Sequence, residues 1–412
     1  MTDVTWLPNT LPDGWRVARM IDHVRLVNGY PFDSALFTAE QGTPLVRIRD
    51  LGSATTEVCY AGAPVPQAEI DRGAVLVGMD GDFNVARWAG GKALLNQRVC
   101  CLTPCATLDT AFLAFVLPAP LKVINDLTGS TTVKHLSSFD ILKIRFPLPP
   151  LNVQARISGH LDAVAGRIDN LLAVKGRLLD LLAEKRKAII ATAVTRGLDP
   201  KVKLRDSGVP WLGEIPEHWE IERARWLFRE RDVRSTTGDE EMLTVSHLTG
   251  VTPRSEKDVN MFEAETNEGY KLCEPGDLVI NTLWAWMGAM GVAPVKGIVS
   301  PAYNVYEPGP RLAPAYIDAL VRLPVFAQEV TRYSKGVWSS RLRLYPEGFF
   351  EVYLPVPPQE EQRAIVAHIA RETAKLDAVR AATERTIALL KERRSALIAA
   401  AVTGQLDVGA AA

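Results

Sequence analysis

A stretch rich in polar, basic and aromatic residues lies between two hydrophobic segments in the first third of the chain. Gly78 and Gly81 mark it as a loop rather than the interior of a strand. Arginine and lysine can donate to guanine edges and phosphates, asparagine and glutamine pair with adenine edges, and aromatic rings offer apolar contact. The stretch therefore predicts a DNA-reading surface, with candidate contacts at Asp80, Asp82, Asn84, Arg87, Trp88, Lys92, Asn96, Gln97 and Arg98.

A second loop in the same half supplies hydroxyls and small residues, which let backbone amides approach phosphates. Its candidate residues are Ser130, Thr131, Thr132, Lys134 and His135.

The second half of the chain places comparable residues at corresponding positions. Arg341 and Arg343 are two apart, so an extended strand would present both on one side. The candidate contacts of this half are Asn281, Trp284, Trp286, Lys335, Trp338, Ser339, Arg341 and Arg343. A polar, glycine-rich loop on its own is usually just a solvated turn, and the tryptophans could equally be core anchors.

Motifs of catalysis are absent from the sequence. There is no GxxxxGK[ST], HExxH or GxSxG, and neither Pro-Pro pair belongs to an amino-methyltransferase motif, since Leu151 and Gln359 follow them. The six histidines are scattered, and the five cysteines form no CxxC pair. We therefore expect a binding protein without a metal site or a cofactor of its own.

The overall charge gives no general attraction to nucleic acid. The 412 residues contain 47 Lys and Arg against 48 Asp and Glu, a formal net charge of -1. A polyanion would have to be held by local patches. One candidate patch is the segment 154–196, with 8 basic and 4 acidic residues, although it could also be an ordinary solvated face.

An internal repeat organises the chain. Residues 181–199 recur at 389–407, an offset of 208, with 12 of 19 positions identical. Upstream, Gln154 matches Gln362, and the segments Phe146–Pro150 and Leu354–Pro358 match as well. Each half is therefore expected to be a globular module followed by a helical module.

The helical modules begin just after the Pro-Pro pairs, because proline biases its predecessor away from helix. Four-three spacing of apolar residues predicts a coiled-coil seam in each helix, so the two helices should pair with one another. In the first helix the seam is expected at Ile157, Leu161, Val164, Ile168, Leu171, Leu178 and Leu182, broken by Lys175. In the second it is expected at Ile365, Ile369, Leu376, Val379, Leu390 and Leu397, interrupted by Glu372, Thr383 and Thr386.

The globular modules show short β-type runs interleaved with helical stretches, so the fold class is predicted as α/β. The expected strands are Thr43–Ile48, Ala74–Val77, Val99–Leu102 and Ile141–Phe146, and the expected helices lie near 108–117 and 315–333. The predicted domains are a first recognition module (1–150), a central helix (151–198), a linker (199–213), a second recognition module (214–356) and a C-terminal helix (357–412). From the sequence, no apolar run is expected to reach the roughly 18 to 20 residues that cross a bilayer, and we expect a cytoplasmic protein that does not bind membranes.

The paired helix blocks, with the entrances Pro147-Leu148-Pro149-Pro150 and Pro355-Val356-Pro357-Pro358, strongly resemble the specificity subunit of type I restriction-modification enzymes. The resemblance covers essentially the whole chain. It implies two pseudo-symmetric α/β target-recognition domains separated by two long antiparallel helices, each domain reading one half of a split sequence in double-stranded DNA.

The resemblance also implies partners. Such subunits do not catalyse; they recruit two methyltransferase (modification) subunits, which use S-adenosylmethionine to methylate adenines, and restriction subunits that translocate DNA with ATP and Mg. In this chain the first helix opens with Asn152-Val153 where the second has Glu360-Glu361. If the acidic pair takes part in docking, the two docking sites for modification subunits would differ.

Two other functions remain open at this stage. The chain could be a scaffold that binds protein instead of nucleic acid, which a gel-shift assay with DNA and a modification subunit would separate. It could also be the recognition part of a split restriction-methylation enzyme, which an adjacent methyltransferase reading frame would distinguish.

The helix between Arg156 and Val194 generates a first prediction. If it sets the spacing of two DNA-reading modules, inserting four residues into it will change the preferred gap between half-sites or abolish binding. Selection of binding sites from random DNA measures that gap, and an unchanged gap would contradict the assignment.

Overall fold

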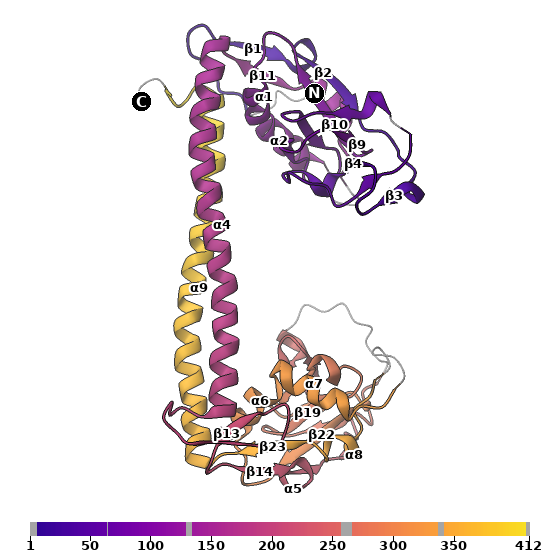
Figure 1. Cartoon of the computed structure of the whole chain (residues 1–412), viewed down its shortest axis with the longest axis vertical. Helices are drawn as coiled ribbons and strands as arrows, with labels where there is room; N and C mark the ends of the chain where they lie inside the picture. Colours follow the sequence, from indigo (N-terminus) through magenta and orange to yellow (C-terminus); the bar gives the residue numbers. More distant parts are fainter. Residues whose placement is uncertain (1–5, 64, 129–133, 257–265, 337–341, 409–412) are drawn as a thin grey trace. The chain divides into compact units, whose positions relative to one another are not determined.

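The computed structural model describes residues 6–63, 65–128, 134–256, 266–336 and 342–408. The chain forms two compact units (Figure 1). Unit 1 contains Met1–Lys175 and Glu384–Ala412, and unit 2 contains Gly176–Thr383. Each unit therefore combines one globular module with the start of one long helix and the end of the other, α4 (Leu151–Arg196) and α9 (Gln359–Val402).

The module of unit 1 is built on an antiparallel sheet of order β2-β10-β7-β8, beside a five-stranded sheet of order β3-β5-β4-β9-β6 in which only β4 and β9 are parallel. Its strands are β1 (Arg16–Arg19), β2 (Val24–Asn28), β3 (Phe37–Thr38), β4 (Thr43–Val46), β5 (Cys59–Tyr60), β6 (Glu69–Ile70), β7 (Val75–Gly78), β8 (Val85–Arg87), β9 (Ala93–Leu95), β10 (Val99–Pro104) and β11 (Arg145–Leu148). Its helices are α1 (Thr110–Val116), α2 (Pro118–Leu127) and α3 (Ser138–Leu142), with short 3-10 turns η1 to η4 at Met20–Asp22, Ser34–Leu36, Ile48–Asp50 and Pro66–Ala68.

The module of unit 2 repeats the antiparallel sheet as β15-β22-β19-β20. Its strands are β12 (Leu204–Asp206), β13 (Glu214–Pro216), β14 (Glu220–Arg223), β15 (Phe228–Glu230), β16 (Leu243–Ser246), β17 (Gly250–Pro253), β18 (Lys271–Cys273), β19 (Leu278–Asn281), β20 (Met290–Val292), β21 (Gly297–Val299), β22 (Tyr303–Pro308) and β23 (Tyr353–Val356). Its helices are α5 (Ala224–Leu227), α6 (Pro314–Val321), α7 (Pro324–Arg332) and α8 (Pro346–Phe349), with 3-10 turns η5 (Arg254–Glu256) and η6 (Ala285–Met287). The α/β class expected from the sequence is confirmed.

Two local expectations differ from the structure. The segment Ile141–Phe146 is not one strand, because Ser137 and Asp140 form a capping box that starts the helical turn α3. The expected linker 199–213 contains β12, which pairs with β13. A capped helical turn therefore replaces part of the expected strand, and a strand of a short hairpin replaces part of the expected linker.

The segment Thr110–Leu127 is the one stretch of described residues that reaches membrane-spanning length and hydropathy, with a mean hydropathy of 1.4. The sequence expectation overlooked it. It forms two short helices instead of one, since Leu117 separates α1 from α2 and proline begins α2. Phe112, Leu113 and Val116 are buried in the core of unit 1, so the segment packs as core helices.

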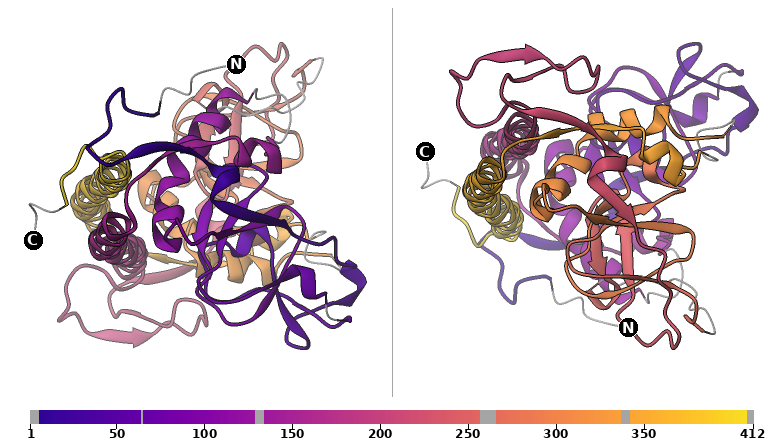
Figure 2. Two further views of the ribbon diagram at one scale, coloured as in Figure 1. Left: turned by 90° about the horizontal axis from the view of Figure 1, so that it is seen from above. Right: turned by 90° about the horizontal axis from the view of Figure 1, so that it is seen from below.

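The long helices pair antiparallel in both units, as predicted. In unit 1, Arg394 of α9 lies 2.9 Å from the carboxylate of Asp169 of α4. In unit 2, Arg186 of α4 lies 2.6 Å from Asp377 of α9. Figure 2 shows the two helices end on and side by side.

The seam between the helices does not use every residue that the sequence predicts. Leu171 and Val379 are 49% and 46% exposed. Thr383, expected as an interruption, is buried together with Thr373. Threonine can occupy these positions because its hydroxyl bonds to the carbonyl one turn earlier, as Thr383 does to Val379 at 2.8 Å.

A buried glutamine fixes the first turn of each long helix to its module. Gln154 accepts the Asp109 N–H at 2.7 Å and donates to the carbonyls of Thr107 and Pro149 at 3.1 and 2.8 Å. Gln362 repeats the pattern in unit 2, where it accepts from Ala313 and donates to the carbonyls of Arg311 and Pro357. We call Gln154 and Gln362 the glutamine anchors.

The end of the other helix completes each core. Ala401 and Val402 of α9 are buried among the core residues of unit 1, and Ala193 and Val194 of α4 are buried in unit 2. The Tyr316 hydroxyl donates to the Val194 carbonyl at 2.9 Å. Each module is therefore held by two helix ends that are far apart in sequence.

Replacement of a glutamine anchor tests this arrangement. Gln154→Leu leaves one N–H and two carbonyls buried without partners, so we expect a loss of about 3 kcal/mol in unfolding free energy. Asn152→Ala, at an exposed position in the same turn, serves as control. Urea denaturation measures both, and equal stability of the two variants would contradict the anchoring role.

Candidate nucleic-acid interface

Three separate segments of unit 1 meet at one end of its main sheet. The loop after β7 hydrogen-bonds to the turn before β10 through Met79 N–H and the Arg98 carbonyl, at 2.8 Å. It also bonds to the segment before α3, since the Leu136 N–H donates to the Met79 carbonyl at 2.7 Å. The fold thus brings together the two loops that the sequence singled out in this half.

Asp80 links the charged side chains of this junction. Its Oδ1 lies 2.7 Å from His135 Nδ1, and its Oδ2 lies 3.5 Å from Arg98 Nε. Lys134 donates to the backbone and side-chain oxygens of Asn125, at 2.7 and 3.0 Å. Asp80, Arg98 and His135 form what we call the charged cluster, which offers both hydrogen-bond donors and acceptors near the surface.

The backbone of this junction is strained at two places. Phe83 and Arg98 adopt the left-handed region with φ of 52° and 77°, which costs about 1 kcal/mol or more for a residue other than glycine. Phe83 is 2% exposed, so core packing holds it there. Arg98 is exposed, and no comparable packing explains its conformation.

Several predicted contact residues of unit 1 lie apart from the charged cluster. Trp88 is 4% exposed and donates its indole N–H to the Gly91 carbonyl at 2.7 Å, so it is a core anchor and not part of the exposed surface. Arg87 forms an ion pair with Asp162 of α4, and Lys92 pairs with Glu69 at 2.7 Å. Trp88 and the two ion-paired side chains therefore contact other residues of unit 1.

The remaining described candidates of this half lie on the loops. Asp82, Asn84 and Gln97 are exposed, whereas Asn96 is half-buried and its side-chain oxygen accepts the Gln97 N–H at 2.8 Å. Ser130, Thr131 and Thr132 lie outside the described residues.

Unit 2 repeats the three-way junction. The Leu344 N–H donates to the Thr282 carbonyl at 3.1 Å, and the Thr282 hydroxyl donates to the Ala302 carbonyl at 2.8 Å. Lys335 and Arg343 exchange two backbone hydrogen bonds of 2.9 Å. By this pattern Thr282, Ala302 and Arg343 correspond to Met79, Arg98 and His135 of unit 1.

The side chains at the junction of unit 2 differ in chemistry from those of unit 1. Trp284 is 49% exposed, and Trp286 is half-buried with its indole N–H bonded to the Leu283 carbonyl at 3.1 Å. Arg343 is exposed, and Lys335 pairs with Glu347 at 2.8 Å. Asn281 is 6% exposed, so its side chain is not part of the exposed surface. Trp338, Ser339 and Arg341 lie outside the described residues.

Sequence reasoning did not find one buried polar group of unit 2. The Lys271 ammonium is 3.4 Å from Asp232 and 3.5 Å from the side-chain oxygen of Asn304, and Lys271 is 5% exposed. The sequence signal that could have indicated burial of this lysine is that hydrophobic residues flank it in what becomes the short strand β18. The Ser300-Pro301 turn, which corresponds to Asn96-Gln97, also supplied no candidate contact residue.

Metal-ligating side chains are not clustered in the described part of the chain, and two of its buried cysteines are protonated. No group of three His, Cys, Asp or Glu side chains among them could hold a metal ion. Burial raises the pKa of Cys100 and of Cys273 to about 12, so neither thiol is a thiolate at neutral pH.

Comparison with known proteins identifies relatives. Residues 12–173 match the family described as type I restriction modification DNA specificity domain. The chain is 26% identical to the type I restriction enzyme EcoBI specificity subunit of Escherichia coli, over 96% of this chain and 87% of that protein. It is 19% identical to the EcoDI specificity subunit of the same organism, over 82% and 78%.

A solved structure shows the same fold. A chain from a structure of a type I R-M system aligns with a TM-score of 0.70 at 19% identity, covering 97% of this chain and 100% of that chain.

The two classes of tryptophan generate a prediction. Trp88→Ala will lower the unfolding free energy by about 3–5 kcal/mol because it empties a core position. Trp284→Ala, at an exposed position, will change it by less than about 1 kcal/mol. Chemical denaturation compares them, and a similar loss in both variants would contradict the assignment of Trp284 to the surface.

Proposed function

The chain belongs to the family of specificity subunits of type I restriction-modification enzymes, and we propose that units 1 and 2 each read one half of a bipartite sequence in double-stranded DNA. The observation that carries the proposal is the repeated three-way junction, which presents loop side chains at the same end of the main sheet in both units.

The chemistry of the two junctions suits base readout. Guanidinium and amide groups can bond to base edges in the major groove, each good bidentate pair contributing about 1–3 kcal/mol of discrimination. The exposed indole of Trp284 offers apolar contact in unit 2. Because the two sets of side chains differ, the two half-sites are expected to differ in sequence.

This chain supplies recognition, and other subunits supply catalysis. The complex would contain two methyltransferase subunits and restriction subunits, with S-adenosylmethionine, ATP and Mg used by those partners and no cofactor bound here. The net charge of -1 accords with shared phosphate binding across the complex. The cytoplasm, where these partners and DNA meet, is the expected location.

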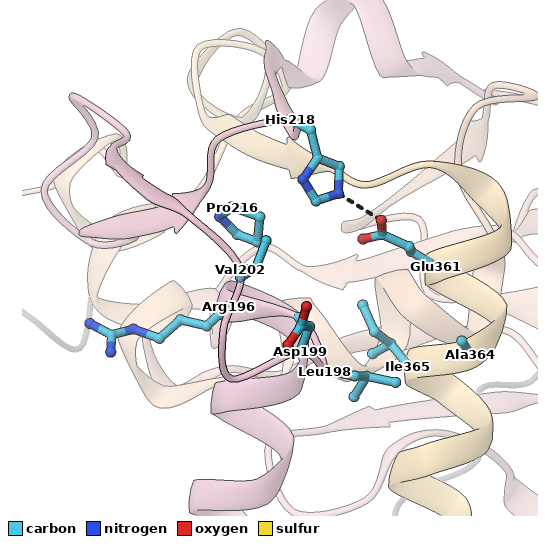
Figure 3. Close-up of a pocket in the computed structure, with 10 residues that line it drawn as sticks. Arg196, Leu198, Asp199, Val202, Pro216, His218, Glu361, Ala364 and Ile365 are labelled. Atoms are coloured by element: carbon cyan, nitrogen blue, oxygen red, sulfur yellow. Dashed lines mark hydrogen bonds and ion pairs between the residues drawn. The ribbon is translucent and has the colours of Figure 1, made fainter.

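The two helix entrances support unequal docking of the methyltransferase subunits. In unit 2 the Glu361 carboxylate accepts from the Trp219 indole at 2.7 Å. It also lies 2.6 Å from His218, and Figure 3 shows this pair. It borders a cavity of about 290 Å³. Unit 1 has Gly14 and Val153 at the matching sequence positions, so this carboxylate bridge belongs to unit 2 alone.

Arg343 provides the test of the proposal. We expect Arg343→Ala, in complex with the modification subunit, to lose about tenfold discrimination in one half-site and none in the other. Selection from random DNA before and after the substitution measures this. Lys203→Ala removes an exposed cation away from the junction and serves as control.

Two outcomes would reject the proposal. Equal loss in both half-sites, or no loss, would contradict the assignment of one half-site to each unit. Failure of the wild-type complex to shift DNA in a gel would favour the scaffold alternative.

A further inference from the structure

The turn that contains Arg98 has a strained backbone, whereas the corresponding turn of unit 2 does not. Asn96–Val99 is a tight turn closed by the Val99 N–H and the Asn96 carbonyl at 3.3 Å. Arg98 occupies its third position with φ 77°, a position that favours glycine. The matching turn of unit 2, closed by Tyr303 and Ser300 at 2.9 Å, has Ala302 there without a positive φ.

The side chain at this strained position lies beside a carboxylate and remains accessible. Its side chain is 57% exposed, and its Nε faces the Asp80 carboxylate at 3.5 Å. Asp80 is itself fixed by His135 at 2.7 Å. Within the described part of the chain, no hydrogen bond engages Nη1 or Nη2 of Arg98, so the two terminal nitrogens form an open fork.

The neighbouring Asp80 carboxylate affects which DNA group such a fork can bind, a backbone phosphate or a guanine edge. A phosphate carries a negative charge, so Asp80 would repel it at close range. A guanine edge is neutral and presents O6 and N7, which match a guanidinium fork. The carboxylate therefore favours the base over the backbone.

We infer that Arg98 reads a guanine in the half-site of unit 1, with Asp80 as the positioning residue that orients its guanidinium. The inference rests on the proposed function and names one base that this unit selects. Strain in the turn is then the cost of projecting an arginine from a position where glycine would be relaxed.

The first experiment separates recognition from stability. Arg98→Gly relaxes the turn and removes the guanidinium, so we expect an unchanged or higher melting temperature together with about ten- to hundredfold loss of preference at one guanine. The half-site of unit 2 should stay unchanged. Arg19→Ala is the matched control, because Arg19 is also exposed and pairs through Nε with a carboxylate, Asp22, at 3.0 Å.

The second experiment tests the atoms involved. In the selected site, replacing that guanine by 7-deazaguanine removes N7. The wild-type complex should then lose about tenfold in affinity, whereas Arg98→Gly should be insensitive to the replacement. Asp80→Asn should reduce the preference for guanine with no change in the half-site of unit 2.

The outcomes distinguish this inference from the proposed function. If the wild type selects a bipartite site and Arg98→Gly selects the same one, the inference is wrong and the proposed function stands. A uniform loss of affinity for all sequences, with a salt dependence reduced by about one charge, would identify a phosphate contact and overturn it. A wild-type complex without sequence preference would overturn both.

Discussion

The buried amide of the glutamine anchors is the interaction on which both units depend. A side chain with three hydrogen bonds can satisfy backbone groups that have no partner in a strand or helix. Gln154 does so for the segment before α1, and Gln362 does so for the segment before α6. Each also bonds to a proline that precedes its long helix. Without it, those N–H and carbonyl groups would be buried unpaired. The same geometry in both halves places each module on its helix in the same way.

The sequence predicts the repeat and the starts of the helices because both depend on local chemistry. Proline pairs stop the preceding strand, and the identical blocks near the helix ends identify residues such as Val194 and Val402 that close the cores. Four-three spacing selects Leu171 for the seam, yet Leu172 is the less exposed of the two, because both are leucines one residue apart and only the partner helix decides which is covered. Thr383 could not be recognised as buried because its hydroxyl is satisfied within its own helix.

The sequence could predict which loops form the candidate interface, but it could not predict how their side chains are arranged. Residue type pointed to Asp80, Arg98 and His135, which the fold joins although 55 residues separate two of them. The same reasoning also selected Trp88, which is buried, because an aromatic ring beside a polar loop can face either way. What separates the two cases is strand pairing. β7 ends where β10 begins, with Gly78 opposite Val99, whereas Trp88 follows β8 at the other end of the sheet, where Arg87 lies opposite Val75.

The division of the chain into units bears on the order in which they can form during synthesis. Unit 2 is one continuous stretch, and all of its residues have been translated once Thr383 is added. Unit 1 begins first but includes residues from Glu384 onward, and its core contains Ala401 and Val402. On the ribosome the core of the amino-terminal module therefore stays incompletely covered until Ala401 and Val402 have been translated, and the unit encoded later is the first that can close.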